Sequence, residues 1–131
     1  MIASAEHMVA RETPQILIVE DDEAMREFLC QAISRSGYYV EAVPDGAEAL
    51  RRVEESHFDL LLTDIRMPGL DGLELARQAR RRYPGLNVLL VTAYVQDALG
   101  ATDLEGAGIE VLSKPFNLNE LIRRVETFLP Q

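Results

Sequence analysis

Cysteine is nearly absent from this chain, since Cys30 is the only one among 131 residues. A single cysteine cannot form an internal disulfide and fits a reducing compartment, so we expect a cytoplasmic protein. Long apolar runs are missing too, and the longest falls far short of a membrane span. The N-terminus has no apolar segment of the signal-peptide type. The sequence therefore predicts neither a membrane contact nor export.

Positive charge is also scarce. The formal net charge is -9, which argues against general nucleic-acid binding. Lys114 is the only lysine, because every other basic residue apart from the histidines is an arginine. The arginine bias reflects composition, but it makes the one ammonium group conspicuous. The 47% share of apolar residues is typical of a globular protein, and 131 residues are enough for one domain with a hydrophobic core.

Strand signals recur five times along the chain. Residues 1–13 have no periodicity and are predicted to be a flexible tail, so that the domain covers residues 14–131. Uninterrupted apolar runs predict strands covered on both faces, at Ile16–Val19, Leu60–Thr63 and Val88–Val91. Glu41 and Glu110 interrupt the other two runs, residues 38–43 and 109–112, which suits edge strands.

Helical periodicity separates these strands. Capping-box spacing predicts helix starts at Asp45 and Asn117, and Gly100 weakens the helix expected over residues 96–104. Two further helices are indicated by apolar stripes, namely Met25, Phe28, Leu29, Ala32 and Ile33 in the first and Leu73, Ala76, Ala79 and Tyr83 in the second. Alternating strands and helices predict an α/β fold, a doubly wound five-stranded parallel sheet of order 2-1-3-4-5 and flavodoxin-like type.

This order brings polar residues to one edge of the sheet. Glu20 and Asp21 end the first strand, Asp64 the third and Thr92 the fourth, and Lys114 follows the fifth. The carboxyl ends of parallel strands lie at the same edge, where such folds bind ligands. Three carboxylates, a hydroxyl and an ammonium group are therefore expected to converge.

Clustered carboxylates at neutral pH take up protons or hold a cation. Oxygen ligands without histidine or cysteine favour Mg²⁺, with Mn²⁺ as an alternative. A carboxylate at Asp64 between a metal and an ammonium group can attack a phosphoryl group. The alternative is a structural role, with acids as helix caps and Lys114 as an ion-pair partner, and we prefer it for Asp22 and Glu23.

Four motifs together resemble the receiver domains of two-component response regulators over roughly residues 15 to 129. They are Ile16–Asp22, Leu62–Gly72, Val91–Ala93 and Lys114–Phe116. The resemblance implies a (βα)5 receiver fold and a signalling switch that is not an enzyme beyond its own phosphoryl transfer and self-dephosphorylation. It also implies a histidine kinase or histidine phosphotransfer protein as phosphoryl donor, and an output through protein contacts.

The resemblance assigns roles position by position. Asp64 would accept the phosphoryl group. Asp21 would bind Mg²⁺ directly, Glu20 would act through water, and the backbone carbonyl of Arg66 would be a further metal ligand. Thr92 and Lys114 would contact the phosphoryl group, and the Lys114–Pro115 peptide bond would be cis.

Two positions depart from the common receiver pattern. Many receivers carry an aromatic residue three positions before the lysine, where this chain has Val111. We hypothesise that Tyr94 or the segment 96–108 carries the conformational change instead. The second departure is the bulk of Arg66 and Tyr94, which we predict to shield an acyl phosphate from water.

Alternatives stay open at this point. A haloacid-dehalogenase-type phosphatase would need an aspartate where Arg66 stands, and a flavin or dinucleotide carrier would need a Gly-rich loop where Glu20–Asp22 stands. A pseudo-receiver that binds partners without phosphorylation is the most serious alternative. The chain ends soon after its last helix, which suggests a stand-alone receiver similar to CpdR-type single-domain receivers. A receiver fragment of a hybrid kinase or a transcription factor would have the same motifs.

Overall fold

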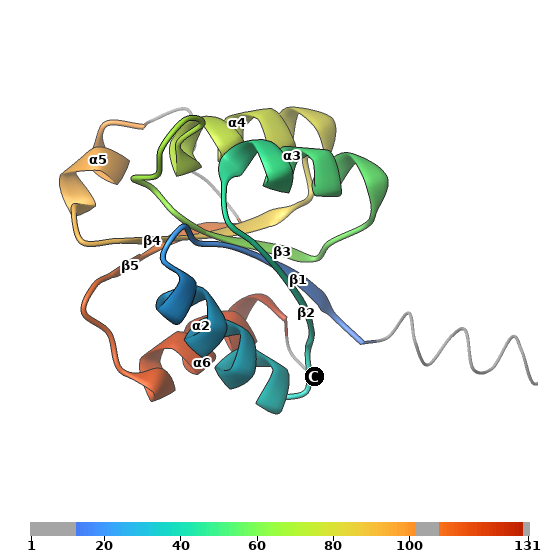
Figure 1. Ribbon diagram of the computed structural model, residues 1–131, viewed down its shortest axis with the longest axis vertical. Coiled ribbons are helices and arrows are strands. Elements are labelled where there is room, and N and C mark those ends of the chain that lie inside the picture. Colours follow the sequence, from blue (N-terminus) through green and yellow to red (C-terminus); the bar gives the residue numbers. More distant parts are fainter. Residues whose placement is uncertain (1–12, 102–107, 130–131) are drawn as a thin grey trace, which may run out of the picture.

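The computed structural model describes residues 13–101 and 108–129 (Figure 1). Its strands are β1 Gln15–Val19, β2 Tyr39–Val43, β3 Leu60–Asp64, β4 Asn87–Thr92 and β5 Ile109–Ser113. They pair in parallel in the order β2-β1-β3-β4-β5, which confirms the predicted fold class. The predicted tail, residues 1–13, lies outside the described residues except for Thr13. No helix in the described ranges has both the length and the apolar character needed to cross a bilayer.

The helices cover both faces of this sheet (Figure 1). They are α2 Glu23–Arg35, α3 Gly46–Glu55, α4 Gly72–Arg82, α5 Val95–Leu99 and α6 Leu118–Phe128. Helices α2 and α6 lie on one face, and α3, α4 and α5 lie on the other. Of the helix predicted over residues 96–104, the structure has α5, which ends before Gly100, and residues 102–107 lie outside the described part.

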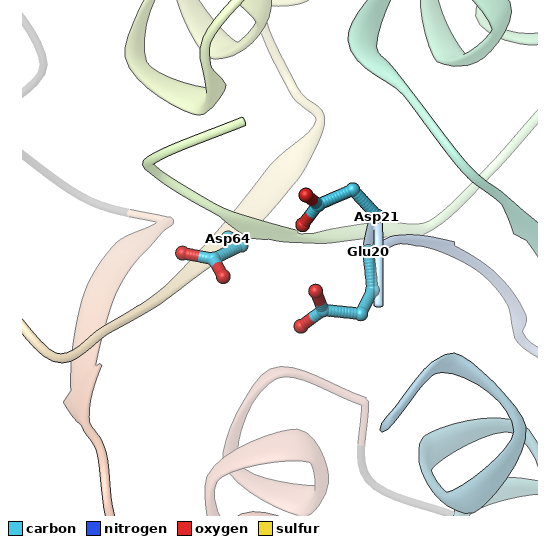
Figure 2. A group of neighbouring side chains, drawn as sticks. All are labelled: Glu20, Asp21 and Asp64. Carbon is cyan, nitrogen blue, oxygen red and sulfur yellow. The ribbon is translucent and has the colours of Figure 1, made fainter. Parts of the chain in front are cut away.

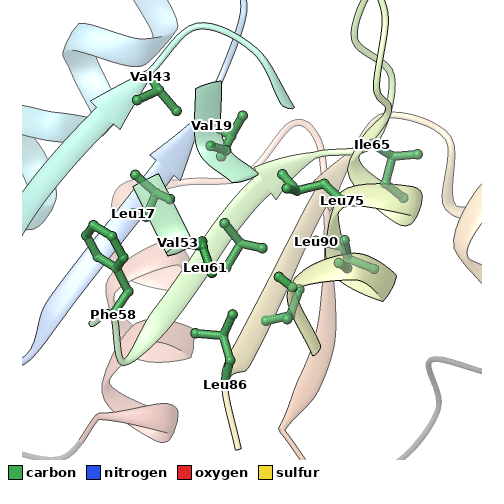
Figure 3. Close-up of a cluster of buried hydrophobic side chains, with 14 of the residues drawn as sticks. Leu17, Val19, Val43, Val53, Phe58, Leu61, Ile65, Leu75, Leu86 and Leu90 are labelled. Carbon is green, nitrogen blue, oxygen red and sulfur yellow. The ribbon is translucent and has the colours of Figure 1, made fainter. Parts of the chain in front are cut away.

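Buried residues of the central strands alternate between two cores. Leu17 and Val19 of β1 pack with α3 and α4, as does Leu61 of β3 (Figure 3). Their neighbours Ile16 and Ile18 pack with α2 and α6 on the opposite face. Successive side chains in a strand point to opposite faces, so an unbroken apolar run fills both cores. This explains why β1, β3 and β4 occupy the middle of the sheet.

One residue in each of the two predicted stripes of α2 and α4 is exposed. Phe28 is 47% exposed and Tyr83 is 41% exposed, so both predictions were wrong. In α2 the buried positions are Leu29 and Ile33, four residues apart, and Phe28 lies about 100° away from Leu29 around the helix axis. Tyr83 is the C-cap of α4, where the chain already leaves the sheet. In α4 the fully buried Leu75 was missed.

Side-chain caps fix where the helices begin after each strand. Asp22, Asp45 and Asn117 each accept a hydrogen bond from the backbone N–H three residues later, in each case at 2.8 Å. The capping predictions are therefore confirmed, and Asp22 has the structural role expected for it. Asp71 caps α4 in the same way at 2.9 Å.

The glutamates of the edge strands bind arginines on the neighbouring helices. Arg52 of α3 donates to both carboxylate oxygens of Glu41, at 2.8 and 2.7 Å, and these bonds lower the pKa of Glu41. Arg124 of α6 lies 3.0 Å from Glu110. These polar strand residues are thus compensated at the sheet edges, and the centre of the sheet stays apolar.

Candidate functional site

The strand ends meet as the sequence predicts. Asp64 is the last residue of β3 and Thr92 the last of β4, while Glu20 directly follows β1 and Lys114 directly follows β5. The parallel register places Asp64 beside Val91 and pairs Thr92 with the last residue of β5. The predicted polar residues therefore share the carboxyl edge of the sheet.

Three carboxylates lie together at this edge (Figure 2). Glu20, Asp21 and Asp64 each offer an oxygen, and these atoms all lie within 4.8 Å of one another. Glu20 is 3% exposed, whereas Asp21 is exposed to solvent. Oxygen donors of this kind fit a hard divalent cation such as Mg²⁺. The donor set thus agrees with the predicted metal site.

Lys114 joins two of these carboxylates. Its Nζ lies 2.9 Å from Asp64 Oδ2 and 3.3 Å from Glu20 Oε1. Burial lowers the pKa of Lys114, but the hydrogen bond and charge of Asp64, together with Glu20, outweigh it and raise that pKa. The ammonium group is therefore charged and held directly against the Asp64 carboxylate.

Several hydrogen bonds hold Glu20 in place. Burial raises the pKa of its carboxyl group, against the lowering effects of the Asp22 N–H and Lys114. The Asp22 N–H donates to Glu20 Oε2 at 3.1 Å. Arg26 of α2 donates to the Glu20 carbonyl oxygen at 3.0 Å. Sequence reasoning missed Arg26, because no capping or strand-end pattern marks an arginine inside a helix.

Thr92 connects the site to the loop that precedes α5. It is fully buried, and its Oγ1 accepts the backbone N–H of Tyr94 at 2.8 Å. Its carbonyl oxygen accepts the backbone N–H of Lys114 at 2.8 Å. The Lys114–Pro115 peptide bond is cis, as the resemblance implies. The hydroxyl of Thr92 thus already has a partner in Tyr94.

Gly72 packs directly behind Asp64. A Cβ at this position would lie 2.0 Å from the Asp64 carbonyl oxygen, closer than any real contact. The Gly72 N–H also donates to the Ile65 carbonyl oxygen at 2.8 Å. Only glycine lets the first turn of α4 come this near to the end of β3. Gly72 ends the motif Leu62–Gly72, but its packing role could not be predicted from its position after a turn and next to the cap Asp71.

Arg66 makes its side-chain contacts on the outer side of this edge. Its Nε lies 2.7 Å from Asp97 Oδ2, and its guanidinium carbon lies 3.7 Å from the centre of the Tyr94 ring. Asp97 is 31 residues away in sequence and was not predicted to take part. Val111, which replaces the common aromatic residue, is partly buried and packs against the core on the same face as Leu17 and Leu61. The predicted shielding by Arg66 and Tyr94 remains a prediction.

Comparison with known proteins decides the family. A model of the response regulator receiver domain matches residues 16–126. The chain belongs to the response regulator receiver family. As a receiver domain it is a two-component signalling protein and not a conventional enzyme. Membership in this family implies a histidine kinase partner in general terms.

Individual receivers support this assignment. The response regulator receiver protein CpdR of Brucella abortus is 43% identical over 115 residues, covering 88% of this chain and 96% of CpdR. The response regulator MprA of Mycobacterium ulcerans is 40% identical over 115 residues, but the chain spans only 50% of its length. The crystal structure of TrrA from Thermotoga maritima in complex with Mg²⁺–BeF is 32% identical with a TM-score of 0.78. The structural alignment covers 89% of this chain and 100% of the TrrA chain.

Proposed function

We propose that this receiver is a phosphorylation-dependent switch that accepts a phosphoryl group on Asp64. The donor is a histidine kinase or a histidine phosphotransfer protein, and the output is a protein–protein contact. The observation that carries the proposal is the position of Asp64, within hydrogen-bond distance of the Lys114 ammonium group and beside two further carboxylates. The proposal includes the cytoplasmic location and excludes direct binding to nucleic acid or membrane.

The chemical step is a phosphoryl transfer between two side chains. A carboxylate oxygen of Asp64 attacks the phosphorus of a phosphohistidine, so that an O–P bond forms as the N–P bond breaks. The leaving imidazole takes a proton and becomes neutral histidine. Hydrolysis later adds water to the acyl phosphate and returns the Asp64 carboxylate and inorganic phosphate.

The acidic residues would hold the metal that this step needs. Glu20, Asp21 and Asp64 fit Mg²⁺, with Mn²⁺ as an alternative, and the Arg66 carbonyl is the proposed backbone ligand. When bound, the cation supplies positive charge that offsets the phosphoryl oxygens. The buried Glu20 is fixed by the Asp22 N–H and Lys114, which leaves the exposed Asp21 as the proposed direct ligand.

Two other residues would act on the phosphoryl oxygens. Lys114 already contacts the Asp64 carboxylate and remains charged, so it stabilises negative charge that develops next to that oxygen. The hydroxyl of Thr92 is a donor as well as an acceptor, so it can turn towards a phosphoryl oxygen. It would then exchange its present contact with the Tyr94 N–H for that new one.

Intact mass after incubation with acetyl phosphate and Mg²⁺ tests the proposal. We expect the chain to gain one phosphoryl group and the Asp64→Asn variant to gain none. Glu27→Gln removes an exposed carboxylate on α2 and serves as the matched control, which should be modified like the parent. No gain by the parent would support the pseudo-receiver, which binds its partners without phosphorylation.

The length of the natural protein is a separate question. The chain covers nearly all of CpdR but half of MprA, so both a stand-alone receiver and a receiver from a longer protein have relatives at similar identity. We propose that the signalling role of this chain is similar to that of CpdR-type receivers, since the alignment covers 96% of CpdR. A receiver from a hybrid kinase or a transcription factor would carry out the same phosphoryl transfer at Asp64.

A further inference from the structure

Arg66 links the two loops that leave the site. It follows Asp64 by two residues in the β3–α4 loop, while Tyr94 follows Thr92 by two residues in front of α5. The guanidinium group stacks on the Tyr94 ring at 3.7 Å and bonds to Asp97 of α5 at 2.7 and 3.3 Å. Two hydrogen bonds and a ring contact hold α5 to the loop that begins at Asp64.

Tyr94 connects this cluster to the Thr92 hydroxyl. Its backbone N–H donates to Thr92 Oγ1 at 2.8 Å, and its carbonyl oxygen accepts the Asp97 N–H at 3.0 Å. Hydrogen bonds therefore connect Thr92 to Tyr94 and Tyr94 to Asp97. Arg66 then connects Asp97 to the loop that follows Asp64. Val111 supplies no aromatic ring that could make this connection through the core.

The Arg66–Asp97 ion pair is partly exposed to solvent, so Arg66 can change its partner at low cost. The side chain of Arg66 is 58% exposed and that of Asp97 is 26% exposed, so water weakens their attraction. Their hydrogen bond raises the pKa of Arg66 and lowers the pKa of Asp97, which keeps both charged. A phosphoryl group on Asp64 would bring about two negative charges and three acceptor oxygens to within two residues of Arg66.

We propose that Arg66 is a partner-exchange residue that positions α5: it binds Asp97 in the unphosphorylated chain and the phosphoryl oxygens after Asp64 is modified. This inference rests on the proposed function. The planar guanidinium group suits both partners, because carboxylate and phosphoryl oxygens accept the same pair of parallel N–H bonds. When Arg66 leaves Asp97 and Thr92 releases the Tyr94 N–H, α5 loses its ties to the site. The output surface that changes is therefore the one formed by Tyr94 and α5.

The exchange predicts a specific pattern of binding energies. Asp97 competes with the phosphoryl group for Arg66, so its removal should favour the phosphorylated state. Loss of Arg66 should disfavour the phosphorylated state, and removal of Asp97 should then no longer change the stability of that state. A double-mutant cycle of Arg66→Gln and Asp97→Asn separates this competition from independent effects at the two positions.

The test uses the phosphoryl analogue beryllofluoride with Mg²⁺, the combination found in the TrrA structure. Its affinity is measured from backbone amide NMR shifts for the parent, both single variants and the double variant. We expect Asp97→Asn to bind about two- to fivefold tighter than the parent, the factor that an exposed ion pair supplies. Arg66→Gln should bind more weakly, and adding Asp97→Asn to it should change nothing. Glu27→Gln, the exposed control on α2, should bind like the parent.

A second readout needs no ligand. In the free chain, Arg66→Gln should shift the amide signals of Val95–Leu99 towards those of the beryllofluoride-bound parent, and leave Leu60–Thr63 unchanged as evidence of an intact fold. Unchanged α5 signals would overturn the exchange. It would also be overturned if Asp97→Asn raised the affinity for beryllofluoride equally in the parent and in the Arg66→Gln variant. A parent that binds no beryllofluoride would overturn the proposed function itself, and this inference with it.

Discussion

The two sides of Asp64 are built in different ways. The inner cluster, Glu20, Asp64 and Lys114, comes from strand ends and is largely buried, with its carboxylates held by an ammonium group. The outer cluster, Arg66, Tyr94 and Asp97, comes from loops and a five-residue helix, and its Arg66 and Tyr94 side chains are exposed to solvent. Buried charges are costly to rearrange, whereas exposed ion pairs exchange partners readily. The inner cluster is thus suited to chemistry and the outer one to a change of shape.

The largest effect should come from removing the inner ammonium group. Lys114→Gln leaves Asp64 and Glu20 without their shared cation, so we expect phosphorylation by acetyl phosphate to slow by about tenfold to 100-fold. The rate is followed by intact mass at fixed Mg²⁺. Lys114→Arg keeps the charge with a different shape and should retain more activity than Lys114→Gln. Equal loss in both variants would mean that shape and not charge is what the inner cluster requires.

The second effect tests how tightly the backbone packs behind Asp64. Gly72→Ala places a Cβ against the Asp64 carbonyl oxygen, and we expect a loss of about 1–3 kcal/mol in the free energy of unfolding. Urea denaturation measures it. Gly85→Ala is the matched control, since a Cβ there meets nothing within 4 Å, and it should be close to neutral. Similar losses at both positions would argue against close packing as the cause.

The third effect concerns the cost of burying Glu20. Burial raises the pKa of Glu20, so its ionised form opposes folding at neutral pH. Glu20→Gln should therefore raise the melting temperature by a few degrees at pH 7 without metal, while it weakens phosphorylation. The parent protonates Glu20 as pH falls through its folded pKa, so the advantage of the variant should shrink there. A variant that is less stable than the parent at pH 7 would contradict this reading.

The smallest effect is expected from the outer cluster. Arg66 and Tyr94 are bulky residues that follow Asp64 and Thr92 by two positions, and we predict that they keep water from the acyl phosphate. The Arg66→Asn, Tyr94→Ala variant should lose its phosphoryl group severalfold faster than the parent in a dephosphorylation time course. Equal or slower loss from the variant would remove the shielding role and leave the outer cluster with a role in shape alone.

The difference between the clusters also explains what the sequence could reveal. Parallel strands that end at one edge must bring together whatever follows them, so Glu20, Asp64 and Lys114 could be placed from strand order alone. Asp97 could not, because its ion pair with Arg66 depends on how the β3–α4 loop folds and where the short helix α5 packs. Arg26 and Gly72 were missed because their roles depend on the tertiary packing of α2 and α4 against strand ends.

Burial within helices showed the same limit. Apolar type and approximate spacing predicted Phe28 and Tyr83 as core residues, but both are exposed. The phase of a helix on the sheet and its exact end decide such cases, and neither is set by local sequence. Leu29 and Ile33, which share the centre of the α2 stripe, were predicted correctly because a small rotation does not expose them.

The central claim is that Asp64 itself carries the phosphoryl group. Borohydride reduces an acyl phosphate to an alcohol and so marks the modified residue permanently. After treatment with acetyl phosphate and Mg²⁺, reduction and peptide mass analysis should show homoserine at position 64 and at no other acidic residue. Reduction at Asp21 or elsewhere, or no reduction after a measured gain of phosphate, would contradict the account.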